Sequence, residues 1–275
     1  MFVYNVIMKY KLIACDLDGT LFNSEFKLSK RTKSVILRAV DAGVIFVVAT
    51  GRPLRGTELV NNLFEIDLPF IVFNGAAAYM GKSKKLLFES FLDYELAKEA
   101  FDIGQRLGLG QVVWTDTRLR ANRICPHTLR YQAFYPDLEV PVISDFSEIG
   151  DDASCVSKVL WVTDPERIGP LQAEMSAHFG DKLNCFSSLP FLLEFVSPVA
   201  SKGTALAEIG RLLDIGSHEM IAFGDAYNDV SMFEYVGFSV AVANAPDDIK
   251  QACDHVTPSN DDDGVAIAIE RFVLS

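Results

Sequence analysis

The chain lacks the features that mark membrane, secreted and nucleic-acid-binding proteins. No apolar segment approaches the length of a membrane span, and the first ten residues lack the basic start and long apolar centre of a signal peptide. Basic residues are outnumbered 25 to 37, which gives a formal net charge of -12. Since no run of Lys or Arg stands out either, we expect a cytoplasmic protein that binds neither membranes nor nucleic acid.

The chain also has little cysteine. Its five cysteines are odd in number, and no two of them form a C-x-x-C pair. Reduced, buried thiols are therefore favoured over disulfides or a zinc site. Cys15 adjoins an acidic turn but lies in an apolar stretch, which favours a small core residue over a nucleophile. Internal repeats and low-complexity tracts are lacking too.

The first residues leave the start of the protein open. Met8 precedes Lys9 and Tyr10, which lead directly into the first apolar stretch. We therefore expect residues 1–7 to be either a loose tail or a segment foreign to the native chain.

An acidic turn follows that first apolar stretch. Leu12-Ile13-Ala14-Cys15 predicts a buried strand, and Asp16-Leu17-Asp18-Gly19-Thr20-Leu21 follows it. Two carboxylates so close together repel each other, and a divalent cation is the obvious group to offset that repulsion. The competing interpretation is an ordinary strand that ends in an Asp-Gly turn.

The first part of the chain alternates apolar stretches with amphipathic helix patterns. The stretches lie at 12–15, 44–49 and 70–73, and the helix patterns at 29–42 and 54–64. This order predicts an α/β fold with a doubly wound, mostly parallel sheet. Since the carboxyl ends of parallel strands share one edge, we expect Thr50, Gly51 and Asn74 to lie near the acidic turn.

The middle of the chain follows another pattern. Short apolar stretches, two of them around Asp116-Thr117, predict antiparallel strands mixed with helices. The change predicts an inserted α+β domain at residues 89–191. Residues 1–88 and 192–275 would then form a discontinuous core domain.

A second acidic turn appears after the insertion. Met220-Ile221-Ala222-Phe223 predicts a strand, and Asp225, Asn228 and Asp229 follow it. If this strand neighbours the first one, the two turns converge on an oxygen-rich Mg²⁺ site. Lys202, at the start of a predicted helix, adds a cation suited to phosphate.

These residue types together indicate phosphoryl transfer. That chemistry depends on positioning and on charge stabilisation by metal, cation and neutral donors. It also permits a carboxylate nucleophile, with the phosphoryl group passing through an aspartyl phosphate. Of two carboxylates two residues apart, one can attack while the other acts as general acid and then base.

At four turns the chain resembles the haloacid dehalogenase superfamily of phosphatases. The resembling segments, in the order of the family motifs, are Asp16–Leu21, Ala49–Arg52, Ser201–Gly203 and Gly224–Asp229. The insertion lies between the second and third, a position similar to that of the type IIB cap in Cof-like sugar phosphatases. Asn74-Gly75-Ala76 and the turn Asn260–Ala266 resemble that subfamily as well.

The resemblance implies a role for each residue. Asp16 would be the nucleophile and a magnesium ligand; Asp18 would be the general acid and base, with its backbone carbonyl on the metal. Asp225 would bind the metal directly, and Asp229 would bind it directly, bind it through water, or orient Lys202. The residues that would hold the phosphoryl group are Thr50, Gly51, Lys202 and Asn228. Arg52 and Asn74 are candidate substrate-binding residues, although Arg52 could equally pack before Pro53.

The resulting prediction is a magnesium-dependent phosphatase that acts on a small phosphate ester, with a sugar phosphate favoured. The inserted domain would close over the site and select the leaving group. Two alternatives stay open: a phosphomutase or phosphotransferase on the same scaffold, and a non-catalytic phosphate-binding module. The oligomeric state is left open.

Overall fold

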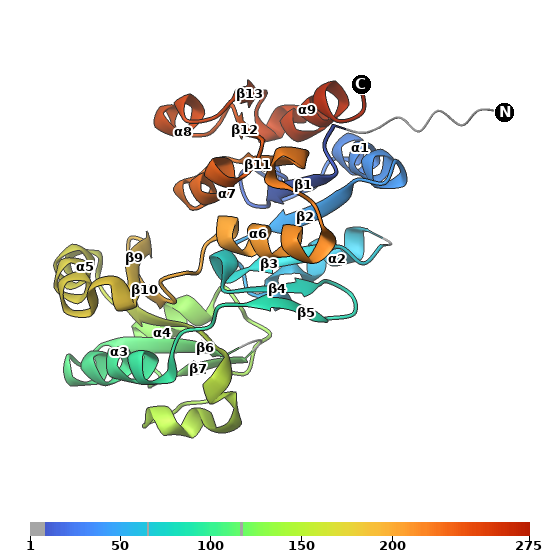
Figure 1. The fold of residues 1–275 in the computed structure, drawn as a ribbon. Coiled ribbons are helices and arrows are strands. Elements are labelled where there is room, and N and C mark those ends of the chain that lie inside the picture. Colours follow the sequence, from blue (N-terminus) through green and yellow to red (C-terminus); the bar gives the residue numbers. More distant parts are fainter. Residues whose placement is uncertain (1–8, 65, 116–117) are drawn as a thin grey trace. The chain divides into compact units, whose positions relative to one another are not determined.

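The strand that ends in the acidic turn lies inside a large sheet. In the computed structural model, which describes residues 9–64, 66–115 and 118–275, β1 (Leu12–Asp16) is part of an eight-stranded sheet with the order β13-β12-β11-β1-β2-β3-β4-β5 (Figure 1). The other strands are β2 (Ile45–Ala49), β3 (Pro69–Val72), β4 (Ala77–Met80), β5 (Leu86–Glu89), β11 (Met220–Gly224), β12 (Phe238–Val242) and β13 (His255–Thr257).

Most neighbouring strands of this sheet are parallel. The pairs from β13 to β3 run parallel, whereas β4 and β5 extend the edge as an antiparallel hairpin. All five residues of β1 are buried, which explains its uniformly apolar sequence before Asp16. The predicted α/β class with a mostly parallel sheet is confirmed.

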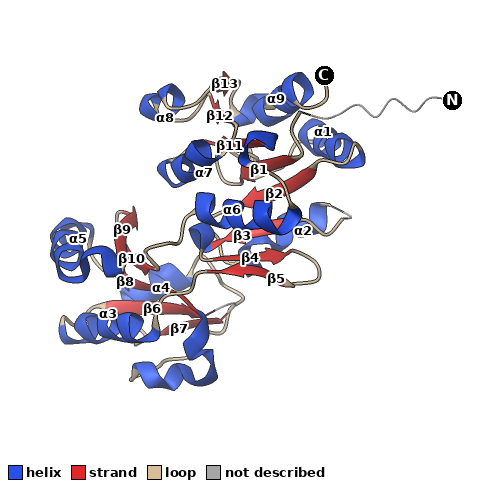
Figure 2. Cartoon of the chain, in the orientation of Figure 1, coloured by secondary structure: helices blue, strands red, loops and turns tan. Residues whose placement is uncertain are grey.

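Helices cover both faces of the sheet (Figure 2). On one face lie α6 (Lys202–Leu213), α7 (Val230–Tyr235) and α8 (Asp247–Gln251), whose apolar side chains pack on those of the strands. On the other lie α1 (Lys30–Asp41), α2 (Glu58–Leu63) and α9 (Gly264–Phe272). The helix predicted over 54–64 is divided, because Leu54–Thr57 forms a 3-10 turn before α2.

The chain divides into two compact units. One contains the described residues up to Arg52, Gly56–Glu89 and Ser201–Ser275; the other contains Pro53–Arg55 and Ser90–Ala200. The second unit has a five-stranded antiparallel sheet, β7-β6-β8-β10-β9, whose apolar core includes α3 and α5. Its elements are α3 (Tyr94–Arg106), β6 (Gly110–Thr115), β7 (Arg118–Ala121), α4 (Pro126–Gln132), β8 (Val156–Val162), α5 (Pro165–Phe179), β9 (Asn184–Leu189) and β10 (Leu192–Val196).

One predicted boundary is wrong. We assigned residues 192–275 to the core domain, but β10 belongs to the sheet of the second unit. It pairs antiparallel with β8 on one side and with β9 on the other. An apolar strand carries no mark of which sheet will accept it, so its own residues could not show this.

Two expectations fall outside the described residues: the turn at Asp116-Thr117 and the nature of residues 1–7. Within the part of the chain that the structure describes, no helix combines the length and apolar character needed to span a membrane.

Gly203, in the first turn of α6, lies close against the residues of α7. A Cβ atom at this position would lie 2.1 Å from the backbone oxygen of Ser231. We expect Gly203→Ala to lower the free energy of unfolding by about 1–3 kcal/mol, because helix α6 would have to shift. Urea unfolding followed by circular dichroism measures this change.

Gly169→Ala in α5 is the control, since a Cβ there would meet nothing within 4 Å. It should leave the free energy of unfolding unchanged or raise it by up to about 1 kcal/mol, because alanine has a higher helix propensity than glycine. Equal effects of both substitutions would contradict the close approach.

Candidate active site

The acidic turns lie side by side at the carboxyl edge of the large sheet. β1 lies between β11 and β2, with Cys15 opposite Phe223 and Asp16 opposite Ala49. The expectation that the strand before Asp225 neighbours the first strand is therefore confirmed. This strand order brings together residues that are some two hundred positions apart in the chain.

Lys202 lies between two buried carboxylates. Its Nζ donates to Oδ1 of Asp16 at 2.5 Å and to Oδ1 of Asp229 at 2.6 Å. All three side chains are buried, with Lys202 and Asp229 at 0% exposure. Ser201 caps α6 by accepting a hydrogen bond from the Thr204 amide, so the helix begins at Lys202. Because Lys202 is buried, it is not simply a solvated lysine at the start of a helix.

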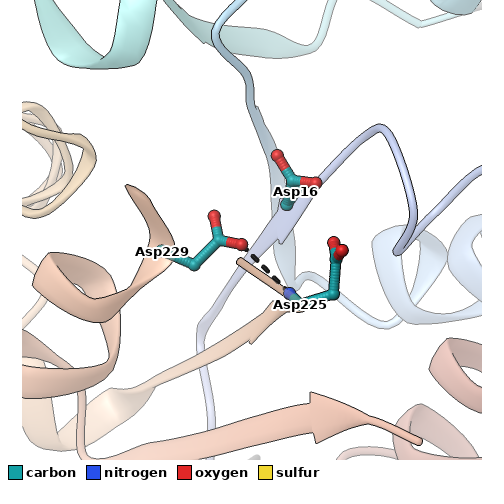
Figure 3. A group of neighbouring side chains, drawn as sticks. All are labelled: Asp16, Asp225 and Asp229. Atoms are coloured by element: carbon teal, nitrogen blue, oxygen red, sulfur yellow. Dashed lines mark hydrogen bonds between the residues drawn. The ribbon is translucent and has the colours of Figure 1, made fainter. Parts of the chain in front are cut away.

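Asp229 uses both of its oxygens. While Oδ1 accepts from Lys202, Oδ2 accepts from the amides of Asp225 and Ala226 at 3.0 Å each. Figure 3 shows the first of these amide bonds, which closes the turn back onto Asp225. Asp229 thus both shapes the second acidic turn and orients Lys202, one of the roles that the family resemblance left open.

Asp225 is oriented by the first acidic turn. Thr20 donates from Oγ1 to Oδ1 of Asp225 at 2.7 Å. Gly19, with φ of 85°, makes the approach possible, because a Cβ there would lie 2.6 Å from Oδ2 of Asp225. The sequence predicts no role for Thr20; the signal that could indicate one is its place in the first acidic turn.

The carboxylates offer an oxygen-rich pocket for a hard cation. Asp16, Asp225 and Asp229 each provide an oxygen within 4.8 Å of the others (Figure 3). Oxygen donors of this kind suit Mg²⁺. Three carboxylates against the one ammonium of Lys202 also leave excess negative charge, which a divalent cation would offset. The donor set therefore fits the implied metal.

The electrostatics agree with this need for a cation. Burial raises the pKa of Asp16 well above its usual range, and Asp229 adds to the rise although Lys202 opposes it. Burial likewise raises the pKa of Asp225. For Lys202, burial lowers the pKa, but the carboxylates of Asp16 and Asp229 outweigh it, so the net pKa is raised and the ammonium stays charged.

The uncharged residues predicted to bind the phosphoryl group or the substrate contact one another. The Thr50 carbonyl accepts from the Asn74 amide at 3.1 Å, and Oδ1 of Asn74 accepts from Nδ2 of Asn228 at 2.9 Å. Gly51 lies against the same asparagine, since a Cβ there would come within 2.9 Å of Oδ1. The hydroxyl of Thr50 is buried and accepts from the Arg52 amide at 3.1 Å.

Arg52 holds Asp18 through two hydrogen bonds. Its Nε donates to Oδ2 of Asp18 at 2.7 Å, and a terminal nitrogen donates to Oδ1 at 2.5 Å. A further nitrogen donates to the Gly56 carbonyl at 3.2 Å. The sequence did not predict this pairing, and the role of Arg52 in substrate binding stays a prediction. Asp18 is not part of the carboxylate group around Asp225.

Comparison with known proteins agrees with this architecture. A family model described as haloacid dehalogenase-like hydrolase matches residues 13–269. The chain is 29% identical to a 5-amino-6-(5-phospho-D-ribitylamino)uracil phosphatase of Bacillus subtilis, over 96% of this chain and 98% of that protein.

Solved structures give the same result. A haloacid dehalogenase-like hydrolase from Bacteroides thetaiotaomicron superposes with a TM-score of 0.84 at 32% identity, over 96% of this chain and 99% of that one. A sugar phosphatase of haloacid dehalogenase subclass IIB superposes with a TM-score of 0.75 at 23% identity, over 95% of this chain and 98% of that one. The second likeness shows a shared fold.

Mg²⁺ should stabilise the folded protein by offsetting the excess negative charge of these carboxylates. A ligand at about one hundred times its Kd adds about 2.7 kcal/mol to the free energy of unfolding. We expect added MgCl₂ to raise the melting temperature of the wild type, and Asp225→Asn to remove most of that rise. Thermal unfolding with MgCl₂ or with EDTA measures the effect.

Asp247→Asn is the matched control, because Asp247 lies on α8 with its side chain 88% exposed. This variant should keep the wild-type response to Mg²⁺. A full response in Asp225→Asn would contradict the assignment of these carboxylates to a metal.

Proposed function

The chain belongs to the family of haloacid dehalogenase-like hydrolases, and we propose on this premise that it is a magnesium-dependent phosphatase of small phosphorylated metabolites. The observation that carries the proposal is the position of Asp16, a buried carboxylate at a strand end that Lys202 and two further aspartates surround. The strand fixes one oxygen of Asp16 against Lys202. A carboxylate held in this way is oriented for attack, which is the condition that nucleophilic catalysis requires.

In the first step, a carboxylate oxygen of Asp16 attacks phosphorus. A bond forms between this oxygen and phosphorus as the bond from phosphorus to the ester oxygen breaks. Asp18 gives its proton to the departing alcohol. In the second step, water attacks the phosphorus of the aspartyl phosphate, Asp18 takes a proton from the water, and inorganic phosphate leaves with Asp16 restored.

The remaining residues hold charge in place. Lys202, the hydroxyl of Thr50, the Gly51 amide and Asn228 supply the donors that we assign to the phosphoryl oxygens. A bound Mg²⁺ would supply charge neutralisation for the carboxylates and for the transferred group, with Asp16, Asp225 and the Asp18 carbonyl as ligands and Asp229 holding Lys202. Asp18 must leave Arg52 before it can donate a proton, and this frees the guanidinium for an anionic substrate.

A phosphorylated sugar or sugar-like polyol is the substrate class we propose. The Bacillus subtilis relative is named for a substrate that carries a phosphoribityl group, and the subclass IIB neighbour is named a sugar phosphatase. The 5-phosphoribityl ester in the first name has a primary alcohol as its leaving group. Such alcohols are poor leaving groups, which makes a well-placed general acid necessary.

Replacement of the carboxylate of Asp16 or Asp18 should abolish or strongly reduce turnover. We expect Asp16→Asn to show no hydrolysis of p-nitrophenyl phosphate above background, since no nucleophile remains. Asp18→Asn should lose about a hundredfold to ten-thousandfold in kcat, because the base that activates water in the second step is lost even where the leaving group needs little acid catalysis. EDTA should abolish wild-type activity, and MgCl₂ should restore it.

Asp247→Asn again serves as the control and should retain wild-type kcat. Hydrolysis that survives in Asp16→Asn, or that proceeds equally well in EDTA, would overturn the mechanism.

A panel of phosphorylated metabolites should identify the substrate class. We expect sugar and polyol monophosphates to release inorganic phosphate with higher kcat/KM than nucleotides or phosphorylated amino acids. Colorimetric phosphate release and product analysis measure this. Transfer of the phosphoryl group to a second sugar in place of water, with a sugar bisphosphate as activator, would show a mutase instead.

A further inference from the structure

Two asparagines that follow β12 and β13 hold the turn that carries Asp18. Nδ2 of Asn244 donates to the Gly19 carbonyl at 2.8 Å, and Nδ2 of Asn260 donates to the Phe22 carbonyl at 2.9 Å. The two are joined to each other, because the Asn260 amide donates to Oδ1 of Asn244 at 3.1 Å. None of these contacts belongs to the phosphate or carboxylate groups described above.

The sheet explains how such distant residues reach the turn. Asn244 follows β12 and Asn260 follows β13, and these parallel strands end at the same edge as β1. The residues after Asn260 continue the attachment. Oδ1 of Asp261 accepts from the Ser24 amide at 2.8 Å, and Oδ1 of Asp263 accepts from the Thr32 hydroxyl at 3.0 Å. The acidic run after Asn260 is thus bound to the segment that follows Asp18.

Within the turn two backbone hydrogen bonds close the chain, and the side chains of Thr20 and Asp18 are bonded to Asp225 and Arg52. The Leu21 amide donates to the Asp16 carbonyl at 3.2 Å, and the Phe22 amide donates to the Leu17 carbonyl at 2.8 Å. The carbonyls of Gly19 and Phe22 accept hydrogen bonds from the two asparagines. Gly19 in this turn has φ of 85°. Glycine can adopt positive and negative φ about equally well, so Gly19 alone does not fix the conformation of the turn.

We infer that Asn244 and Asn260 are positioning residues for the general acid: they fix the turn after Asp18 and thereby the place from which its carboxyl group reaches the leaving oxygen. This inference rests on the proposed function. A small displacement of a catalytic group can cost a large factor in rate. Loss of either asparagine should therefore weaken proton donation more than it weakens attack by Asp16, which precedes the turn on β1.

The dependence of rate on the leaving group tests this. Phenol ionises near pH 10, as tyrosine does, so phenyl phosphate needs the general acid. p-Nitrophenol is far more acidic, and its phosphate needs the general acid much less. For Asn244→Ala and Asn260→Ala we expect kcat/KM to fall about tenfold or more with phenyl phosphate, a part of the usual acid-base contribution, but about twofold with p-nitrophenyl phosphate.

The ratio of the two kcat/KM values is the measurement, because it does not depend on the fraction of enzyme that is folded. Asn244→Ser is a milder second variant should an alanine variant fold poorly. Asn23→Ala is the matched control: Oδ1 of Asn23 accepts from the amides of Glu25 and Lys27, within its own loop. It should leave the ratio unchanged.

The outcomes separate this inference from the proposed function. If the wild type hydrolyses neither ester, the proposed function fails and this inference fails with it. If the wild type hydrolyses both and each asparagine variant loses both activities by the same factor, the asparagines are structural only and the inference alone is overturned.

Discussion

One ammonium group between two buried carboxylates is the interaction on which the site depends. Moving charges out of water costs several kcal/mol for each ion, and only close, fully used hydrogen bonds repay it. Lys202 meets this condition with Asp16 and Asp229, and Asp229 uses its second oxygen for two backbone amides. The cluster nevertheless keeps an excess of negative charge. A phosphoryl group would add to this negative charge, so the same geometry that fixes Asp16, the proposed nucleophile, creates the need for a divalent cation.

The burial of Lys202 in turn dictates how its helix is placed. The first turn of α6 comes so close to Ser231 that a side chain at Gly203 has no room, and Oγ of Ser231 accepts a hydrogen bond from the Gly203 amide at 3.1 Å. Helix α6 is therefore fixed against the residues of α7, which directly follow Asp229. Lys202 is the first residue of α6, and Asp229 directly precedes α7. Asp16 is the last residue of β1.

The sequence predicted the sheet and most of the site because both rest on local signals. Buried parallel strands are apolar throughout, and a change to polar residues in the sequence indicates where each strand ends. The sequence could not predict contacts whose partners carry no such signal. Thr20 reaches Asp225 across 205 positions, and Asn244 reaches Gly19 across 225. The place of β10 was missed for a related reason, since strand pairing depends on partners elsewhere in the chain.

The two cations of the site differ in how freely they can change partners. Lys202 is buried, and loss of either carboxylate would leave its charge poorly compensated. Arg52 and Asp18 are 30% and 40% exposed, where an ion pair contributes about 0.2–1 kcal/mol. Water and a substrate phosphate can therefore compete for Arg52 at little cost. The proposed nucleophile, Asp16, is thus held by a fixed partner, whereas the proposed general acid, Asp18, is held by a partner that it can leave, as a group that must move a proton requires.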